Sequence, residues 1–306
     1  MFFILKGLFF NMNTIECVLP TINICFASND IYCEHLATAI YSLICNANMF
    51  RCYDILIVNK DISIENKNKI LNLIRNYKNF SIRFIDVSNY EKFVSYNVGA
   101  YYSIETNYRL FLLSELFSNY DKIIYLDSDI VVTGDISKLF DISVNGYLVG
   151  AIKDSSIKYH EISKRAICFE DNYIYNINTY RTKFLNLKFP NDYFNAGVLL
   201  INLKECRKTI TFDDVMNTLH SKNFIYNDQD VLNILFNGKI KFLDVIWNYM
   251  NNIESLLKND LYKNYYIDLK RQNYNIIHYI GQLKPWNSKV YLDEYYHKYN
   301  MLMNEL

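Results

Sequence analysis

The sequence is poor in the two residues that most often interrupt helices and strands, with 8 glycines and 3 prolines among 306 residues. It contains no low-complexity linker, so we expect one large folded unit that can bury a sizeable core. The chain also has no formal net charge, because its 32 lysines and arginines balance 32 aspartates and glutamates. A chain without an excess of basic residues is not expected to bind nucleic acid or to be drawn strongly to an anionic membrane.

The seven cysteines form no ordered pattern. They include no Cys-x-x-Cys pair, and their odd number argues against a complete set of disulfides. Several lie within apolar segments that have the spacing of strands or helices. We therefore predict reduced core cysteines of a cytoplasmic protein.

A hydrophobic run long enough to cross a membrane is absent as well. The apolar residues 1–10 fall well short of the roughly 20 that span a bilayer, and no small-residue cleavage site follows them. We interpret residues 1–21 as an N-terminal extension, with Met12 as an alternative start. We expect at most peripheral membrane contact, by a protein that is cytoplasmic or lies at the inner face of the membrane.

The chain does contain a regular alternation of apolar runs and amphipathic stretches. The runs predicted as strands cover residues 22–27, 53–58, 81–86 and 122–126. The stretches with helical spacing between them cover 34–45, a segment that opens at Ser63, and 108–117. This order predicts an α/β fold with a Rossmann-like, mostly parallel central sheet flanked by helices.

The second half of the chain is less regular. Further strands are predicted at 147–152, 194–203 and 276–279, and further helices at 212–219 and 231–236. Residues 155–193 are polar, rich in tyrosine and without a clear period. Such a region is typical of a variable substrate loop or a lid.

Two carboxylates one residue apart, Asp127 and Asp129, follow the fourth predicted strand. In open α/β sheets, ligands bind at the carboxyl ends of the strands. Two hard oxygen ligands at this spacing can turn toward one divalent cation, and Mg²⁺ or Mn²⁺ bound in this way usually also holds substrate phosphate. We therefore predict a metal site at this pair.

A second acidic pair, Asp228 and Asp230, precedes the predicted helix 231–236. One interpretation is capping of that helix by Asn227 or Asp228. The other is a polar cluster with Gln229 that holds sugar hydroxyls, whose donors and acceptors suit carboxylates and amides. Metal at the first pair and sugar at the second is the simplest division between the two.

His278 and Lys284 follow the last predicted strand. A lone histidine is more often an ordinary core or surface group than a ligand, but a neutral imidazole can also complete a site begun by Asp127 and Asp129. Mn²⁺ accepts mixed nitrogen and oxygen ligands, whereas Mg²⁺ prefers oxygen. Lys284 would then bind phosphate beside the metal, the alternative being an ordinary solvated lysine.

Taken together, these segments resemble family 8 of the retaining glycosyltransferases, the family of bacterial lipopolysaccharide galactosyl- and glucosyltransferases and of glycogenin. The resemblance is carried, in family order, by Phe26-Ala27-Ser28, Arg109, Tyr125-Leu126-Asp127-Ser128-Asp129, Phe194-Asn195-Ala196-Gly197-Val198-Leu199-Leu200-Ile201-Asn202-Leu203, Asn227-Asp228-Gln229-Asp230-Val231-Leu232-Asn233, and His278-Tyr279-Ile280-Gly281 with Lys284-Pro285-Trp286. It implies a GT-A fold over residues 22–287, with a small C-terminal helical extension over 288–306.

The activity that the resemblance implies is transfer of galactose or glucose from a UDP-sugar to a hydroxyl of a saccharide acceptor, with retention at the anomeric carbon. The implied cofactor is Mn²⁺, with Mg²⁺ as a substitute, which stabilises the UDP leaving group. The acceptor would be a lipid-linked glycan or a glycoprotein glycan, and the implied pathway is synthesis of lipopolysaccharide or another surface glycan.

The resemblance also implies roles for single residues. The implied metal ligands are Asp127, Asp129 and His278, and the implied catalytic residues are Asp228, Gln229 and Asp230. The implied substrate contacts are Ala27, Ser28, Asn29, Asp30, Arg109, Asp127, Ser128, Asp129, Asn195, Ala196, Asp228, Gln229, His278, Gly281 and Lys284.

Two positions bear on how closely the family mechanism applies. The family position of a nucleophile matches Gln229, and an amide is a poor nucleophile, so we favour front-face attack by the acceptor hydroxyl, with a UDP phosphate oxygen taking its proton. Asn29 stands where family members commonly have an aspartate that contacts uracil. The contact is then made by Asn29, or by Asp30 in a shifted register.

Three other functions compete with this one. A haloacid-dehalogenase-type phosphatase would use Asp127 as nucleophile and Asp129 as acid and base, but its motif normally lies near the N-terminus rather than after three strand–helix units. A non-catalytic sugar-binding homologue would keep the fold without turnover. A glycogenin-like protein would glycosylate its own tyrosines.

Overall fold

A seven-stranded sheet forms the centre of the protein, for which the computed structural model describes residues 19–94, 103–164, 166–170, 173–269 and 273–305. The strands follow the order β10-β6-β9-β4-β1-β2-β3, and four of the six neighbouring pairs are parallel. Antiparallel β9 separates β4 from β6. The strands are β1 (Ile22–Ala27), β2 (Tyr53–Asn59), β3 (Phe80–Asp86), β4 (Ile123–Leu126), β6 (Val149–Lys153), β9 (Phe194–Ile201) and β10 (Ile240–Phe242). This arrangement confirms the predicted α/β, mostly parallel sheet.

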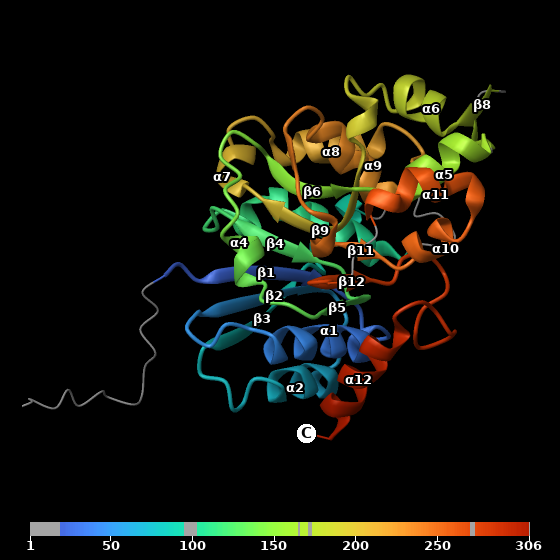
Figure 1. Ribbon diagram of the computed structural model, residues 1–306. Coiled ribbons are helices and arrows are strands. Elements are labelled where there is room, and N and C mark those ends of the chain that lie inside the picture. Colours follow the sequence, from blue (N-terminus) through green and yellow to red (C-terminus); the bar gives the residue numbers. More distant parts are fainter. Residues whose placement is uncertain (1–18, 95–102, 165, 171–172, 270–272, 306) are drawn as a thin grey trace, which may run out of the picture.

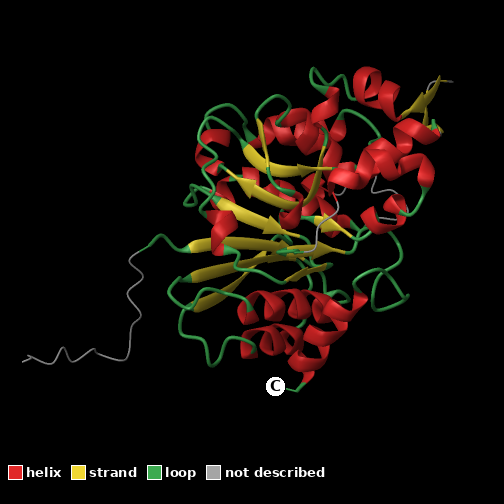
Figure 2. Ribbon diagram, in the orientation of Figure 1, coloured by secondary structure: helices red, strands yellow, loops and turns green. Residues whose placement is uncertain are grey.

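Helices cover both faces of the sheet (Figure 2). The helix α12 packs along α1, and α8 lies beside α9 over the other end of the molecule (Figure 1). Side chains of each strand therefore alternate between two hydrophobic clusters: Ile55 and Ile57 point into one, and Leu56 and Val58 into the other. The helices are α1 (Cys33–Cys45), α2 (Ile64–Asn72), α8 (Phe212–His220), α9 (Asn227–Leu235) and α12 (Asp293–Asn304).

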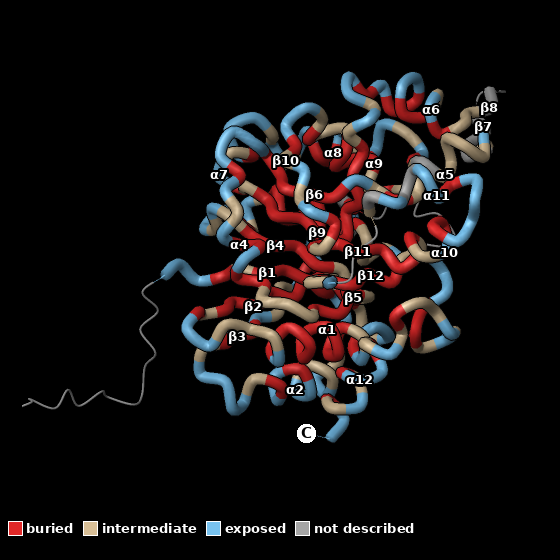
Figure 3. Tube along the Cα trace, viewed as in Figure 1, coloured by how far each residue is buried: buried red, intermediate tan, exposed pale blue. Residues whose placement is uncertain are grey.

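Burial on both faces explains the continuous apolar runs of the sequence. Every residue of β2 and of β9 is buried, and the strands form the buried centre of the trace in Figure 3. A strand buried on both faces does not need alternating polar residues. For this reason the apolar runs at 22–27, 53–58 and 194–203 predicted strands within about two residues of their observed ends.

A second, three-stranded sheet determines where the functional residues meet. It consists of β5 (Ile130–Val132), β12 (Ile276–His278) and β11 (Tyr249–Met250). The antiparallel register of β12 and β5 places His278 opposite Ile130, one residue after Asp129. The apolar residues on the two sides of the first acidic pair therefore belong to different sheets.

The structure differs from the sequence-based expectation in two regions. The predicted helix 108–117 is instead two 3₁₀ helices, η1 (Ile104–Leu113) and η2 (Glu115–Phe117), separated by the extended residue Ser114. The region 155–193 is more ordered than predicted, with short helices and the hairpin β7–β8. Its elements are α5 (Ser156–Ser163), β7 (Ala166–Glu170), β8 (Tyr173–Asn176), α6 (Ile177–Thr179), η3 (Tyr180–Phe184) and η4 (Pro190–Asp192).

The short elements that remain connect these layers. They are α3 (Glu91–Val94), α4 (Ser137–Phe140), α7 (Leu203–Cys206), η5 (Val245–Trp247), α10 (Ile253–Leu257), α11 (Asp260–Tyr266) and η6 (Ile267–Leu269). Over the described ranges, none of the helices is long and apolar enough to cross a membrane.

Among the cysteines that the structure describes, Cys45 and Cys52 depart from the prediction of reduced core residues. Cys25, Cys33, Cys45 and Cys206 are free, and all but Cys45 are buried. Cys52 is disulfide-bonded, so the prediction of uniformly reduced cysteines is wrong there. Sequence spacing alone did not indicate this bond, since no regular cysteine pattern accompanies it.

Candidate active site

A cavity of about 510 Å³ opens at the carboxyl ends of β1 and β4. Ligand sites of open α/β sheets lie at this edge. All of the predicted substrate contacts except Asp30 line the cavity. They come from segments as distant in the chain as β1 and the loop before α12, so the fold brings the predicted motifs to one place.

Asp127 and Asp129 lie at the end of β4, where the chain leaves the central sheet. The backbone N–H of Asp127 still bonds to Gly197 O of β9 at 2.9 Å, and the next strand, β5, joins the second sheet. The Ser128 hydroxyl donates to Ala27 O at 3.1 Å and ties this turn to the end of β1. Both carboxylates are thereby directed into the cavity.

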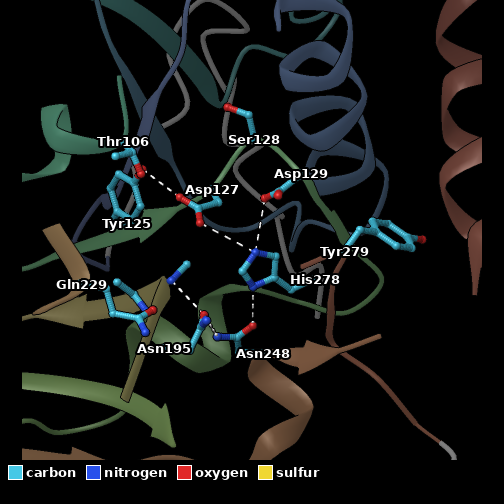
Figure 4. Close-up of polar contacts among 12 residues, drawn as sticks. Thr106, Tyr125, Asp127, Ser128, Asp129, Asn195, Gln229, Asn248, His278 and Tyr279 are labelled. Atoms are coloured by element: carbon cyan, nitrogen blue, oxygen red, sulfur yellow. Dashed lines mark hydrogen bonds and ion pairs between the residues drawn. The ribbon is translucent and has the colours of Figure 1, made fainter. Parts of the chain in front are cut away.

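His278 faces this pair from the end of β12 (Figure 4). Its Nε2 lies 3.3 Å from Asp129 Oδ1 and 3.7 Å from Asp127 Oδ2, and its side chain is almost fully buried. One ligand atom from each of the three residues lies within 4.8 Å of the other two. One nitrogen and two carboxylate oxygens at this separation can converge on a single cation.

The two carboxylates are oriented by different partners. Asp127 Oδ1 accepts from the Tyr125 hydroxyl at 3.0 Å and pairs with Arg109 Nη2 at 2.8 Å, which turns Oδ2 toward His278. Asp129 Oδ2 pairs with the ammonium of Lys284, which also donates to Tyr279 O. Each carboxylate thus uses one oxygen for orientation and keeps the other for a ligand.

Asp129 provides the test of whether a metal fits. Its Oδ1 is buried and has no hydrogen-bond partner among the residues that the structure describes. Burial opposes ionisation of this carboxyl, but the ammonium of Lys284 acts in the opposite direction, and the pKa of Asp129 lies well below its usual range. A buried, ionised oxygen without a donor is suited to a divalent cation, and the mixed nitrogen and oxygen set suits Mn²⁺.

Arg109 connects the metal pair to the second acidic segment. Its Nε lies 2.7 Å from Asp228 Oδ2, and its Nη1 donates to Ala196 O at 2.6 Å. Burial raises the pKa of Asp228 to about 7, although Arg109 acts in the opposite direction. The arrangement gives one cavity wall a paired cation and carboxylate, and such groups can bind hydroxyls.

The capping interpretation of the second acidic segment is wrong for Asn227 and Asp228. Helix α9 begins at Asn227 without a side-chain cap, and Asp228 bonds instead to Arg109 and to the Thr106 hydroxyl. Asp228 and Gln229 lie in the first turn of α9, and both line the cavity.

Gln229 has both ends of its amide engaged. Its Oε1 accepts from the Ala196 backbone N–H at 3.0 Å. Its Nε2 donates to Asp154 Oδ2 at 3.1 Å and to the Tyr193 hydroxyl at 3.2 Å. The amide therefore presents a fixed polar surface to the cavity.

Two predicted site residues lie outside the cavity lining. Asp30 Oδ1 accepts from Ser63 N at 2.8 Å and from Asn66 Nδ2 at 2.7 Å, at the start of α2. Asn29 does line the cavity, so the shifted register that would use Asp30 gains no support. Asp230 is fully buried behind the cavity wall.

The contacts of Asp230 indicate a structural role. It accepts from the hydroxyls of Tyr180 and Tyr193, both at 2.6 Å, and from Tyr226 N at 2.9 Å. Burial raises the pKa of Asp230 to about 6, although these three bonds lower it. The carboxylate thus links α9 to η3 and to the start of β9.

Asp230→Asn is expected to lower the free energy of unfolding by about 1–3 kcal/mol, because one buried tyrosine hydroxyl loses its acceptor. We expect kcat/KM of the folded protein to stay within about tenfold of wild type, as the side chain does not reach the cavity. Denaturant unfolding and initial rates measure the two quantities. A large loss of rate with unchanged stability would instead support a catalytic Asp230.

Several cavity residues were not predicted as site residues from the sequence, Asp154 and Tyr32 among them. Asp154, directly after β6, contributes a further carboxylate, and Tyr32 contributes an aromatic ring 5.8 Å from the ring of Trp286. Asp154 lies in a segment without a recognisable motif. Tyr32 follows Asn29 by one helical turn, and this spacing is the one signal that could have indicated it.

The family model for glycosyl transferase family 8 matches residues 23–290. The chain belongs to glycosyltransferase family 8. A putative glycosyltransferase of Haemophilus influenzae is 30% identical over 277 residues, which are 88% of this chain and 74% of that protein. Lipopolysaccharide 1,2-glucosyltransferase of Escherichia coli is 30% identical over 182 residues, which are 59% of this chain and 48% of that protein.

The fold comparison agrees with the family. The crystal structure of galactosyltransferase LgtC in complex with donor and acceptor sugar analogs superimposes with a TM-score of 0.70 at 24% identity, over 92% of this chain and 96% of that chain. This similarity confirms the predicted GT-A type of fold. Membership in family 8 implies a retaining glycosyltransferase with a nucleotide-sugar donor and a saccharide acceptor, and decides against the phosphatase.

Proposed function

We propose that this family 8 enzyme transfers galactose or glucose from a UDP-sugar to a hydroxyl of a saccharide acceptor, with Mn²⁺ held by Asp127, Asp129 and His278. The observation that carries the proposal is the convergence of these three ligands beside the ammonium of Lys284. A divalent cation next to a lysine suits a diphosphate, whose negative charge needs both. Mg²⁺ is a candidate substitute.

The chemistry requires stabilisation of the leaving group. When bound, Mn²⁺ would supply Lewis-acid neutralisation of the charge that develops on the UDP phosphates. Lys284, almost fully buried, adds a positive charge that bulk water screens only weakly. The backbone at Gly281 lines the same wall and can approach phosphate closely, since glycine has no side chain there.

The donor sugar is proposed to lie against Arg109, Asp228 and Gln229. Arg109 pairs with both Asp127 and Asp228, so a sugar hydroxyl can bond to Asp228 without leaving the guanidinium unpaired. Carboxylates and amides can form hydrogen bonds with a hydroxyl in more than one orientation. Galactose and glucose, which differ only in the orientation of the C4 hydroxyl, therefore both remain candidates. Ala27, Ser28 and Asn29 line the end of β1 and are proposed to contact the uracil and ribose.

The names of the relatives support a hexose as the transferred sugar, but they do not distinguish galactose from glucose. One relative carries the name glucosyltransferase, and one structural neighbour carries the name galactosyltransferase. By analogy with the first of these, we propose a role in lipopolysaccharide or other surface-glycan synthesis, with a lipid-linked or glycoprotein glycan as acceptor.

Gln229→Ala is expected to lower kcat by about 10 to 100-fold, without accumulation of a glycosyl-enzyme. The reason is that an amide whose oxygen already accepts from Ala196 N is a poor nucleophile, so its loss removes positioning rather than a covalent step. Single-turnover kinetics and intact-mass spectra measure both effects. Loss beyond about 10⁴-fold together with a trapped adduct would favour double displacement over front-face attack.

The proposed function is tested by a donor panel. We expect Mn²⁺-dependent hydrolysis of UDP-Gal or UDP-Glc in the absence of acceptor, and little of UDP-GlcNAc, with activity lost on chelation and restored by added Mn²⁺. Binding of a UDP-sugar without any turnover would favour the non-catalytic sugar-binding protein. A gain of intact mass by one or more hexoses would favour self-glycosylation, and no hydrolysis or binding of any donor would refute the assignment.

A further inference from the structure

We infer that Asn248 is a positioning residue that holds His278 in the tautomer with its proton on Nδ1. The orientation of Asn248 is in turn set by a chain of side-chain amides that ends on the carboxylate of Asp154. The consequence for metal affinity rests on the proposed Mn²⁺ site, whereas the tautomer itself follows from protein contacts alone.

The chain of side-chain amides begins at Asn195. Two groups determine the orientation of the Asn195 amide independently. The backbone N–H of Gly197 can only donate, and it reaches Asn195 Oδ1 at 3.0 Å, so this atom must be the amide oxygen. The other end of the same amide lies 3.3 Å from Asp154 Oδ2, and a carboxylate oxygen can only accept. Both contacts therefore require the same orientation of Asn195.

The orientation passes from Asn195 to Asn248 and then to the imidazole. Asn248 faces Asn195 Oδ1 at 2.9 Å, so the atom that it presents there must be its amino group. Its oxygen then faces His278 Nδ1 (Figure 4), and the two atoms are 2.9 Å apart. An imidazole nitrogen that faces an amide oxygen must donate. Nε2 is left with a lone pair directed at the two carboxylates.

Asn248 opposes a tautomer that the carboxylates would otherwise favour. A proton on Nε2 would bond to Asp129 Oδ1 at 3.3 Å, and that form of the imidazole cannot bind a cation through Nε2. Asn248 has 0% exposure, so water cannot replace its oxygen as the acceptor for Nδ1–H. The amide chain thus keeps the Nε2 lone pair of His278 available to a cation, as outer partners of metal-binding histidines commonly do.

A pair of matched variants tests the role in metal binding. Asn248→Leu removes the acceptor at nearly constant volume, and we expect Mn²⁺ affinity, measured by electron paramagnetic resonance of free Mn²⁺, to fall about 10 to 100-fold. The control is Asn59→Leu, which removes another fully buried amide, one that donates to Ile57 O at 3.1 Å outside the cavity. The control should lose stability and keep the wild-type Mn²⁺ affinity.

The tautomer is measured directly by ¹⁵N chemical shifts of the His278 ring in metal-free protein at about pH 8.5, where free imidazole is neutral. We expect a protonated Nδ1 in wild type and in Asn248→Asp, which keeps an oxygen for this proton, and a protonated Nε2 in Asn248→Leu. A protonated Nε2 in wild type would overturn the inference, as would wild-type Mn²⁺ affinity in folded Asn248→Leu. Because the wild-type spectrum needs neither a variant nor metal, it decides the tautomer even if wild type binds no Mn²⁺, an outcome that would overturn the proposed function alone.

Discussion

Asp129→Asn is expected to lower kcat/KM by about 10³-fold, a larger loss than for any other single polar replacement in the cavity. The variant keeps the size of the side chain but replaces an ionised ligand by a neutral amide. In the wild type, Asp129 Oδ1 is buried and lacks a donor among the described residues, and Asp129 Oδ2 pairs with Lys284. The substitution therefore weakens the metal site and leaves a buried ammonium without its carboxylate.

Three measurements separate these effects. Mn²⁺ affinity should fall with kcat/KM, the stability of metal-free protein should change little or fall, and added Mn²⁺ should recover only part of the rate. Asp121→Asn is the control, because that carboxylate is 69% exposed on its side chain and pairs with Arg207 at the surface. Activity of Asp129→Asn within about tenfold of wild type at low Mn²⁺ would exclude Asp129 as a metal ligand.

The strands of the central sheet were predictable because local chemistry and tertiary environment agree there. An apolar run such as 22–27 is typical of a strand buried on both faces, and the structure places one at Ile22–Ala27. The break after Leu126 was not predictable in the same way. The residues 130–132 are as apolar as those before Asp127, and they join the second sheet because they pair with Ile276–His278, far away in the sequence.

The helix at 108–117 shows a different limit of sequence patterns. Its apolar residues suit a helix of either α or 3₁₀ type, so periodicity alone cannot choose between them. Ser114 decides the outcome locally: it is extended, its hydroxyl donates to Phe111 O, and its oxygen accepts from Leu116 N. A side chain that bonds to the backbone on both sides ends one turn and begins the next.

The role of a site residue was predictable where the residue type alone indicates its chemistry. The prediction failed where contacts with distant residues determine the role. Asp127, Asp129 and His278 are types that bind cations, and the fold brings them together. Asp230 has the same chemistry as Asp228, but two tyrosine hydroxyls hold it behind the cavity wall. Neither tyrosine lies near Asp230 in the sequence, so no local pattern could separate the two carboxylates.

Gly197→Ala is the second replacement with a large expected effect, although it adds a single methyl group. A Cβ at this position would lie 2.2 Å from His278 Cε1 and 2.8 Å from Asp127 Oδ2, closer than nonbonded atoms approach. Neither neighbour can yield easily. The His278 ring is buried and bonded to Asn248, and Asp127 is held by Arg109 on its other oxygen.

We expect Gly197→Ala to lower Mn²⁺ affinity at least about 100-fold and to lower the free energy of unfolding by about 1–3 kcal/mol, since overpacking displaces the imidazole. Gly146→Ala is the matched control. It meets no atom within 4 Å but has φ +79°, so it should lose about 1 kcal/mol through backbone strain and keep full metal affinity. Calorimetry with Mn²⁺ and denaturant unfolding of both variants make the comparison. If Gly197→Ala bound Mn²⁺ as wild type does, the cation would have to be held by groups other than His278 and Asp127, because the added methyl group occupies the space between them.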